Sequence, residues 1–158
     1  MYAVNSTTAL RSYVAALLAV SFGVNWVWEV AQMVAYAPAP GRSRVGEFLI
    51  CTLAAAGDAA LTLFVFAAAA VVKHPGRWVW DGGWKAYGAA ALAGGALAVL
   101  IERLALAAGY WSYAAAMPLV PLLGVGLLPF VQLTLLVPFA LWAAARSVAR
   151  FSGDSNHV

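Results

Sequence analysis

Residues 12–37 read SYVAALLAVSFGVNWVWEVAQMVAYA, an apolar stretch that is long enough to cross a membrane and contains one carboxylate, Glu29. A bilayer core requires about 20 apolar residues of helix. Three more such stretches follow, so the four predicted spans cover residues 12–37, 46–72, 86–109 and 124–146. The sequence therefore predicts an all-α polytopic membrane protein, a four-helix transmembrane bundle in which residues 1–158 form a single integral membrane domain.

The composition supports a membrane protein and excludes several other classes. Of the 158 residues, 65% are hydrophobic and only 9% are charged, which lies outside the range of soluble globular domains. The basic residues stand mostly between the apolar runs, so we expect no nucleic-acid partner. Cys51 is the only cysteine, which excludes an internal disulfide, a zinc finger and an iron–sulfur cluster. We predict neither a cofactor nor a metal ion.

Prolines and basic residues between the spans predict the topology. Pro38-Ala39-Pro40-Gly41 ends the first span and Lys73-His74-Pro75-Gly76 ends the second, because proline removes a backbone donor. With four spans, the two termini and the second loop share one side. The basic residues of that side are Arg11, Lys73, Arg77, Lys85, Arg146 and Arg150, whereas the other side has Arg42 and Arg44. The positive-inside rule then places both termini, including a short polar tail at 147–158, in the cytoplasm, and we expect a bacterial cytoplasmic membrane.

Aromatic and proline residues predict further features of the bundle. We expect Trp78, Trp80 and Trp84 to form a cytoplasmic aromatic belt, and Tyr110, Trp111 and Tyr113 part of the outer one. The segment between Tyr113 and Gly124 is apolar but rich in proline and glycine. It is either an ordinary extended connection or a lid or short re-entrant turn. Pro129 and Pro138 predict kinks in the last span.

Polar residues of the first two spans recur at helical spacing. At about 100° per residue, the first span places one set of polar side chains on a single face. This set comprises Ser21, Asn25, Glu29, Gln32 and Tyr36. The second span has a similar stripe of Glu47, Cys51, Asp58 and Thr62. Ionisable groups at membrane depth are costly and usually face a protein interior, so both stripes are expected to point inward.

The remaining spans add polar residues at a similar depth. The third contributes Glu102 and Arg103, and the fourth contributes Gln132. Three deep carboxylates then face one deep cation, so we expect at least one carboxyl group to be protonated at neutral pH. The cluster could donate or relay protons, or it could be a structural network in which Arg103 pairs with carboxylates and amides satisfy the rest. Cys51 is expected to be a packing residue, and Trp28 either lines a cavity or packs.

Several motifs resemble those of known membrane proteins. Asn25-Trp-Val-Trp-Glu-Val-Ala-Gln32, Ala56-Gly57-Asp58 and Gly109-Tyr-Trp-Ser-Tyr113, followed by Met117-Pro118 and Pro129-x-x-Gln132, resemble an uncharacterised family of short multi-pass bacterial membrane proteins. Glu102 ahead of Gly109-Tyr-Trp-Ser-Tyr113 is also similar to membrane-embedded carotenoid-biosynthesis proteins of the cyclase type, although the Pro-x-Glu-Glu acidic pair expected of a cyclase is absent. That resemblance implies that a protonated carboxyl group starts a carbocation, which Trp111 and Tyr113 stabilise by cation–π attraction.

Three functional hypotheses follow from the predicted cluster. The first is an intramembrane enzyme or binding protein for a membrane lipid or other lipophilic small molecule, including an isoprenoid or carotenoid. Its catalytic residues are Glu29, Asp58 and Glu102, and its substrate-binding residues are Asn25, Gln32, Arg103, Gln132, Trp28, Trp111 and Tyr113. The second is a proton-coupled transporter of small solutes, which would require a homo-oligomer. The third is an accessory structural subunit of a larger membrane complex.

Overall fold

The fold is all-α, as the sequence predicts. The structure is a computed structural model that describes residues 7–38, 41, 43–72 and 78–154. Its elements are α1 (Thr7–Gln32), the 3-10 turn η1 (Met33–Ala35), α2 (Arg44–Val72), α3 (Trp78–Asp81), α4 (Gly83–Ala108) and α5 (Leu127–Asp154). In this described part, four helices are long and apolar enough to cross a membrane. Their number and positions confirm the predicted spans and are those of an integral membrane protein.

The helix ends differ from the predicted boundaries by a few residues. α1 begins earlier than predicted, at Thr7, and its last turn tightens into η1. α5 continues beyond the predicted end at residue 146, so residues 147–154 are helical. The predicted second-span terminator at 73–76 lies outside the described residues. So do Ala39, Pro40, Arg42 and Arg77, and residues 155–158 of the predicted tail.

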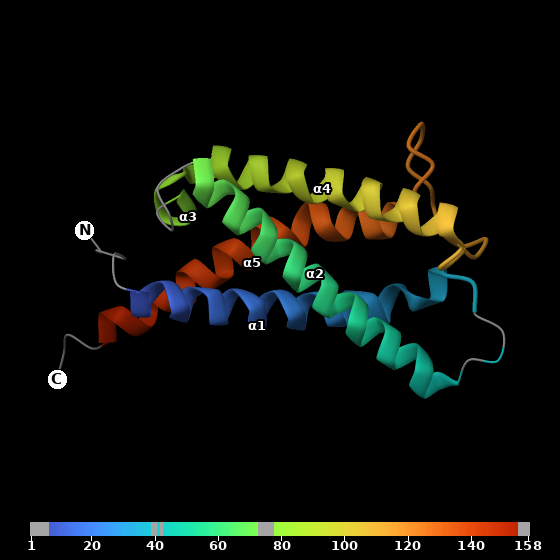
Figure 1. The fold of residues 1–158 in the computed structure, drawn as a ribbon, viewed down its shortest axis with the longest axis horizontal. Helices are drawn as coiled ribbons and strands as arrows, with labels where there is room; N and C mark the ends of the chain where they lie inside the picture. The colour runs from blue at the N-terminus through green and yellow to red at the C-terminus, as the bar shows by residue number, and fades with distance from the viewer. Residues whose placement is uncertain (1–6, 39–40, 42, 73–77, 155–158) are drawn as a thin grey trace.

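The four long helices pack as a row in the order α2, α1, α5, α4. α1 packs along both α2 and α5, and α5 packs along α4, whereas α2 makes few contacts with α4 or α5. Figure 1 shows that the end of α2 lies near the start of α4, while the start of α2 lies far from α4. The start of α1 and the end of α5 lie at the same end of the molecule. The bundle is therefore closed near its termini and divided at its other end.

A glycine pair explains how closely α4 and α5 approach. A Cβ atom added to Gly94 would lie 2.3 Å from the backbone oxygen of Leu133, and one added to Gly95 would lie 2.9 Å from the Thr134 hydroxyl. Small residues allow helix backbones to approach closely where lipid supplies no hydrophobic driving force. The sequence Gly94-Gly95 therefore fixes α4 against α5 beside the polar residues of α5.

The half of the bundle that contains the start of α1 and the end of α5, here called the terminal half, has an apolar core. Tyr13, Leu17 and Leu141 are fully buried there. The Tyr13 hydroxyl donates to the Leu141 carbonyl at 3.2 Å, and its ring lies 4.9 Å from that of Phe66. The large groups of this core are thus packed, and the buried Tyr13 hydroxyl has an acceptor.

The predicted aromatic belt of the terminal half is only partly correct. Trp84 is exposed, as a belt residue should be, but Trp78 is buried. Trp78 belongs to the short helix α3 and stacks on Phe66 with ring centroids 6.0 Å apart. The prediction for Trp78 is wrong because α3 folds back against α4 and α5 instead of lying flat at the membrane surface.

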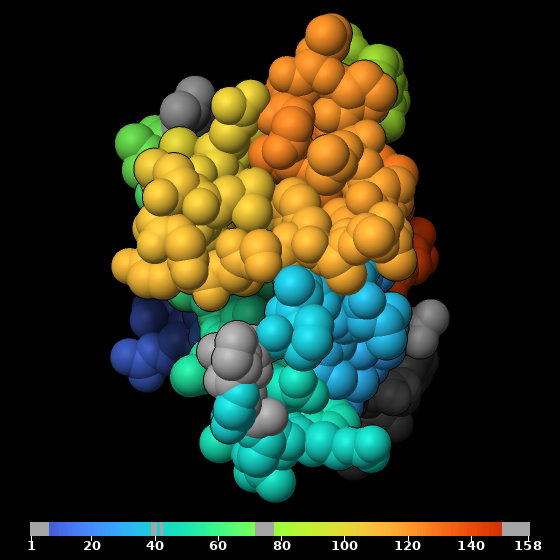
Figure 2. Space-filling model, turned by 90° about the vertical axis from the view of Figure 1, so that its right-hand side faces the viewer, coloured from blue at the N-terminus to red at the C-terminus, as the bar shows by residue number. Residues whose placement is uncertain are grey.

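Residues 109–126, here called the connection, form an ordered cap over the opposite end of the bundle. Its backbone pairs with η1 and the segment that follows it: Ala37 N donates to Ser112 O at 2.9 Å, and Ala114 N donates to Ala35 O at 3.0 Å. Leu127 N donates to Pro118 O at 2.7 Å, which closes a hairpin. Figure 2 shows this contact, with the connection in yellow to orange against the light blue segment around η1. These backbone polar groups of the cap are satisfied by protein, as membrane surroundings require.

The two prolines of the last span have different effects. Pro129 lies in the first turn of α5, where backbone N–H groups have no intrahelical partner, so it removes no helical hydrogen bond. The predicted kink at Pro129 is therefore wrong. Pro138 lies inside α5 and leaves the Thr134 carbonyl without its usual donor, but the helix continues through it.

Candidate functional site

A cavity of about 860 Å³ lies in the half of the bundle opposite the termini, here called the site half. One wall belongs to α2 and includes Ile50, Ala54 and Asp58, and the facing wall belongs to α4 and includes Ile101 and Glu102. The end of α1 and the start of α5 form its base. The cavity exists because α2 packs along α1 and diverges from α4 toward its own beginning (Figure 1).

The base of the cavity is a network of carboxyl and amide groups from three helices. Gln132 of α5 lies with its Nε2 atom 3.0 Å from Asn25 Oδ1, 2.9 Å from Glu29 Oε1 and 2.8 Å from Asp58 Oδ2. Gln32 Nε2 donates to Gln132 Oε1 at 2.8 Å and to Glu29 Oε1 at 2.9 Å. Asn25, Gln32 and Gln132 are buried. The predicted inward stripe of the first span is therefore confirmed, and Gln132 links it to α2.

The network continues toward the terminal half through hydroxyl groups. Asn25 Nδ2 donates to the Ser21 carbonyl at 2.8 Å, and Ser21 Oγ donates to Thr62 Oγ1 at 3.0 Å. Thr62 in turn donates to the Asp58 carbonyl at 2.9 Å. Beyond Ser21 and Thr62 the apolar core begins with Leu17 and Phe66. The polar layer is thus confined to the site half.

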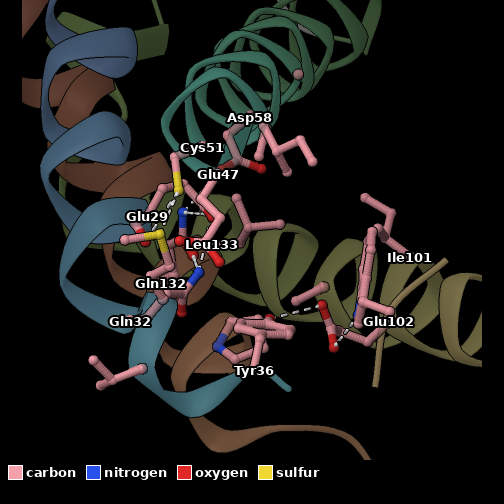
Figure 3. A pocket seen from close by; sticks show the side chains of 18 of the residues that line it. Glu29, Gln32, Tyr36, Glu47, Cys51, Asp58, Ile101, Glu102, Gln132 and Leu133 are labelled. Atoms are coloured by element: carbon pink, nitrogen blue, oxygen red, sulfur yellow. Dashed lines mark hydrogen bonds between the residues drawn. The ribbon is translucent and has the colours of Figure 1, made fainter. Parts of the chain in front are cut away.

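Glu102 forms a second cluster, made with aromatic side chains of the cap. Its Oε1 atom accepts from the Tyr36 hydroxyl at 3.3 Å, and its Oε2 atom accepts from Trp111 Nε1 at 3.4 Å and from the Tyr113 hydroxyl. The Tyr113 oxygen also accepts from Gly126 N at 2.7 Å. Figure 3 shows Glu29, Gln32 and Gln132 gathered together, with Glu102 set apart beside Tyr36. Both clusters line the same cavity.

The two phenols on Glu102 remain protonated over a wide pH range. Tyr36 and Tyr113 lie outside the membrane-spanning segments. Burial raises the pKa of the Tyr36 hydroxyl, and the nearby charge of Glu102 raises it further. Burial also raises the pKa of the Tyr113 hydroxyl, as does its hydrogen bond to Glu102. Both phenols therefore act as hydrogen-bond donors to Glu102 at neutral pH.

Arg103 does not join the cluster, contrary to the prediction. Its side chain is exposed, and it makes no hydrogen bond or ion pair with any described residue. The reason is helical geometry: Ile101 and Glu102 line the cavity, and Arg103 points about 100° further around α4, away from it. Glu102 is buried, and Arg103 therefore points outward. The alternative in which Arg103 pairs with deep carboxylates is therefore wrong for the described residues.

The other predicted site residues lie at the cavity or next to it. Trp111 lines the cavity, and Trp28 reaches the network by donating from Nε1 to Gln32 Oε1 at 3.0 Å. Cys51 is buried on the predicted inward stripe and lies 3.7 Å from the Glu29 carbonyl, which fits a packing role. Tyr36 and Glu47 were not predicted as site residues, yet both line the cavity. Their positions on the two polar stripes were the available signal.

The charge around the cavity is one-sided. Four carboxyl side chains line it, those of Glu29, Glu47, Asp58 and Glu102, and no lysine, arginine or histidine is among its described lining residues. The remaining lining is mostly apolar, including Met33, Leu61 and Leu133. Within the described ranges, no group of three histidine, cysteine, aspartate or glutamate side chains could hold a metal ion. The site can therefore offer protons, carboxylate oxygens, amides and aromatic faces.

Comparison with known proteins gives no match for this chain: no family model, no curated protein and no solved structure matches it.

Proposed function

We propose that the protein binds a lipophilic molecule inside the membrane, with the polar end of that molecule at the carboxyl and amide groups of the cavity, and that these groups exchange protons with it. The observation that carries the proposal is the cavity itself, whose lining is mostly apolar but includes the polar groups of Glu29, Asp58, Gln132 and Glu102. Ligand pockets of about 300–1,000 Å³ with apolar walls and a few converging polar groups are typical of small-molecule sites.

The entry route we propose is lateral, between α2 and α4. These two helices form the ends of the row and separate toward the site half. Leu49, Leu53 and Leu104 on their outer surfaces are exposed and apolar, as lipid-facing residues are. A hydrophobic molecule could then pass from the bilayer to the cavity without crossing water.

The confinement of the polar groups favours this proposal over a transporter. A path for a polar solute must cross the whole membrane, but the terminal half is filled by buried apolar groups such as Leu17, Val137 and Leu141. The polar layer ends at Ser21 and Thr62. A polar site that is closed toward the terminal half by apolar groups suits binding and proton exchange at a single depth.

The charge of the lining predicts which lipophilic molecules are accepted. An anionic head group would face four carboxyl groups with no cation among the described lining residues to neutralise it, and like charge in a low-dielectric site is strongly unfavourable. We therefore propose that the ligand is neutral or cationic at its polar end. An isoprenoid alcohol, a carotenoid or a quinone fits this requirement, whereas a fatty acid or an anionic phospholipid does not.

The test is to identify what the purified protein retains. The protein is purified in mild detergent, extracted with organic solvent and examined by mass spectrometry against an unrelated membrane protein from the same cells. Gly57 lines the cavity, and a Cβ atom added to it would meet nothing within 4 Å, so Gly57→Phe should fill space without disturbing the fold. We expect a neutral or cationic lipophilic molecule in the wild type and at least a tenfold loss in Gly57→Phe.

The matched control is Gly23→Phe, because a Cβ atom at Gly23 also meets nothing within 4 Å but Gly23 does not line the cavity. This variant should retain the molecule at the wild-type level. Equal retention by Gly57→Phe, or enrichment of no lipophilic molecule in the wild type, would reject the proposal. Enrichment of an anionic lipid would reject the charge selection.

A further inference from the structure

The hydrogen-bond pattern at the base of the cavity determines which amide atoms are donors. Trp28 Nε1 can only donate, so the Gln32 atom that it contacts must be the oxygen. The Gln32 nitrogen then donates to Gln132, whose facing atom must be its oxygen. The Ser21 carbonyl can only accept, so the Asn25 atom that it contacts must be the nitrogen. The Trp28 donor and the Ser21 carbonyl thus fix the orientation of all three amides.

With these orientations, the Gln132 nitrogen has fewer hydrogens to donate than there are oxygens around it. The Gln132 nitrogen carries two hydrogens, but it lies within 3.0 Å of three oxygens, those of Asn25, Glu29 and Asp58. At least one oxygen therefore receives nothing from Gln132. A buried acceptor without a donor is costly, and a buried carboxylate without donors is more so. Protonating one carboxyl group lowers this cost, because a neutral carboxyl oxygen without a donor is less unfavourable than a carboxylate oxygen without one.

The three carboxyl groups differ in the donors available to them. Glu102 accepts from Tyr36, Trp111 and Tyr113, through both of its oxygens. The Oε1 atom of Glu29 accepts from Gln32 independently of Gln132. Asp58 has a single donor, the Gln132 nitrogen that it shares with two other oxygens. The second oxygen of Glu29 and that of Asp58 both have no hydrogen-bond partner among the described residues, so the separate donor from Gln32 is what distinguishes Glu29. Asp58 is thus the carboxyl group least able to remain ionised.

No nearby positive charge among the described residues changes this ranking. The titratable groups that interact with Asp58 are Glu29 from α1 and Glu102 from α4, and Tyr36, Glu47 and Cys51 line the same cavity. The α5 residue that contacts Asp58 is the neutral Gln132. These neighbours that can carry charge are therefore acidic, and none of them offers Asp58 a positive charge.

We propose that Asp58 is the carboxyl group that holds a proton at neutral pH and presents it to the molecule in the cavity, while Glu29 and Glu102 are held as hydrogen-bond acceptors. The part of this proposal that concerns the bound molecule rests on the proposed function. It narrows the ligand class to molecules whose polar end accepts a hydrogen bond, such as a carbonyl, hydroxyl or ether oxygen. A quaternary ammonium head group, which cannot accept one, is disfavoured.

Infrared spectroscopy tests the assignment without any ligand. A protonated carboxylic acid has a carbonyl stretch separate from carboxylate bands, and a detergent without ester groups keeps that region clear. The purified full chain at neutral pH should show this band. Labelling aspartate side chains with ¹³C should shift the band, and labelling glutamate should not. Asp58→Asn should abolish the band, while Glu29→Gln and Glu102→Gln should leave it in place.

Each outcome decides the assignment. No protonated band at neutral pH, a band that shifts with labelled glutamate, or a band that persists in Asp58→Asn would overturn it. The isotope experiment uses the wild-type protein, so it remains decisive even if a variant fails to fold. Loss of the band in a well-folded Asp58→Asn, together with absence of any retained molecule in the wild type, would support the proton assignment and reject the proposed function separately.

Discussion

The terminal half and the site half of this protein are built from the same long helices but bury different groups. The terminal half buries apolar side chains, and the site half buries polar ones beside a cavity. In the terminal half, Leu17 and Leu141 are fully buried and the buried phenol of Tyr13 finds a backbone acceptor. In the site half, the buried groups include Asn25, Gln132 and Glu102, and α2 has moved away from α4 around a cavity. The difference teaches that a closed apolar half can hold the helices in place while the other half remains open.

This division also explains how costly polar groups are tolerated at membrane depth. Buried amides and carboxyl groups must find partners, and here Gln132 contacts residues from both α1 and α2. The network can hold α5 in register with the two helices it touches. We infer that stability resides mainly in the terminal half and ligand selection in the site half, and three substitutions test this comparison.

The largest expected effect is in the terminal half. Leu141→Ala should lower the free energy of unfolding by about 2–3 kcal/mol, because it leaves a cavity in a fully packed core and lipid cannot fill it. Leu135→Ala on the same helix is the matched control, since Leu135 is 55% exposed and should change stability by less than about 0.5 kcal/mol. Equilibrium unfolding in detergent measures both. Equal losses would show that the terminal half is not the stabilising core.

A smaller effect is expected at the cap of the site half. Tyr113→Phe removes a donor to Glu102 and an acceptor for Gly126 N, and should cost about 1 kcal/mol at neutral pH because Tyr113 is only half-buried. Folding raises the pKa of the Tyr113 hydroxyl, so its contribution is complete below its unfolded value of about 10 and is lost as the pH rises above that. The stability of the wild type should therefore fall more steeply above about pH 10 than that of the variant. Parallel pH profiles would contradict this account of Tyr113.

The smallest effect is expected for Arg103→Gln. Arg103 is exposed and does not line the cavity. The binding free energy of the retained molecule and the free energy of unfolding should therefore each change by less than about 0.5 kcal/mol. Mass spectrometry of retained molecules and unfolding in detergent measure the two quantities. A loss of retention as large as that of Gly57→Phe would place Arg103 back in the site and sharpen the boundary of the site half.

The sequence predicted much of the site because helical periodicity is a local property. The spacing of Ser21, Asn25 and Gln32 placed them on one face, and all three are buried. Periodicity failed where the direction of a single side chain mattered. Glu102 and Arg103 are adjacent in the sequence, and their spacing did not show that Glu102 points inward while Arg103 points outward. The burial of Trp78 was missed because it depends on how α3 folds back against α4 and α5.

The sequence by itself determined the number of spans, the two polar stripes and the surplus of acidic groups at one depth, because length, hydropathy and the helical repeat are set along each segment. The tertiary structure alone decided that Gln132 links Glu29 to Asp58, that Glu102 turns instead to Tyr36, Trp111 and Tyr113, and that a cavity separates α2 from α4. These features depend on which helices are neighbours and where they diverge. That choice is made by packing between distant segments, such as Gly94 against α5, and no single segment encodes it.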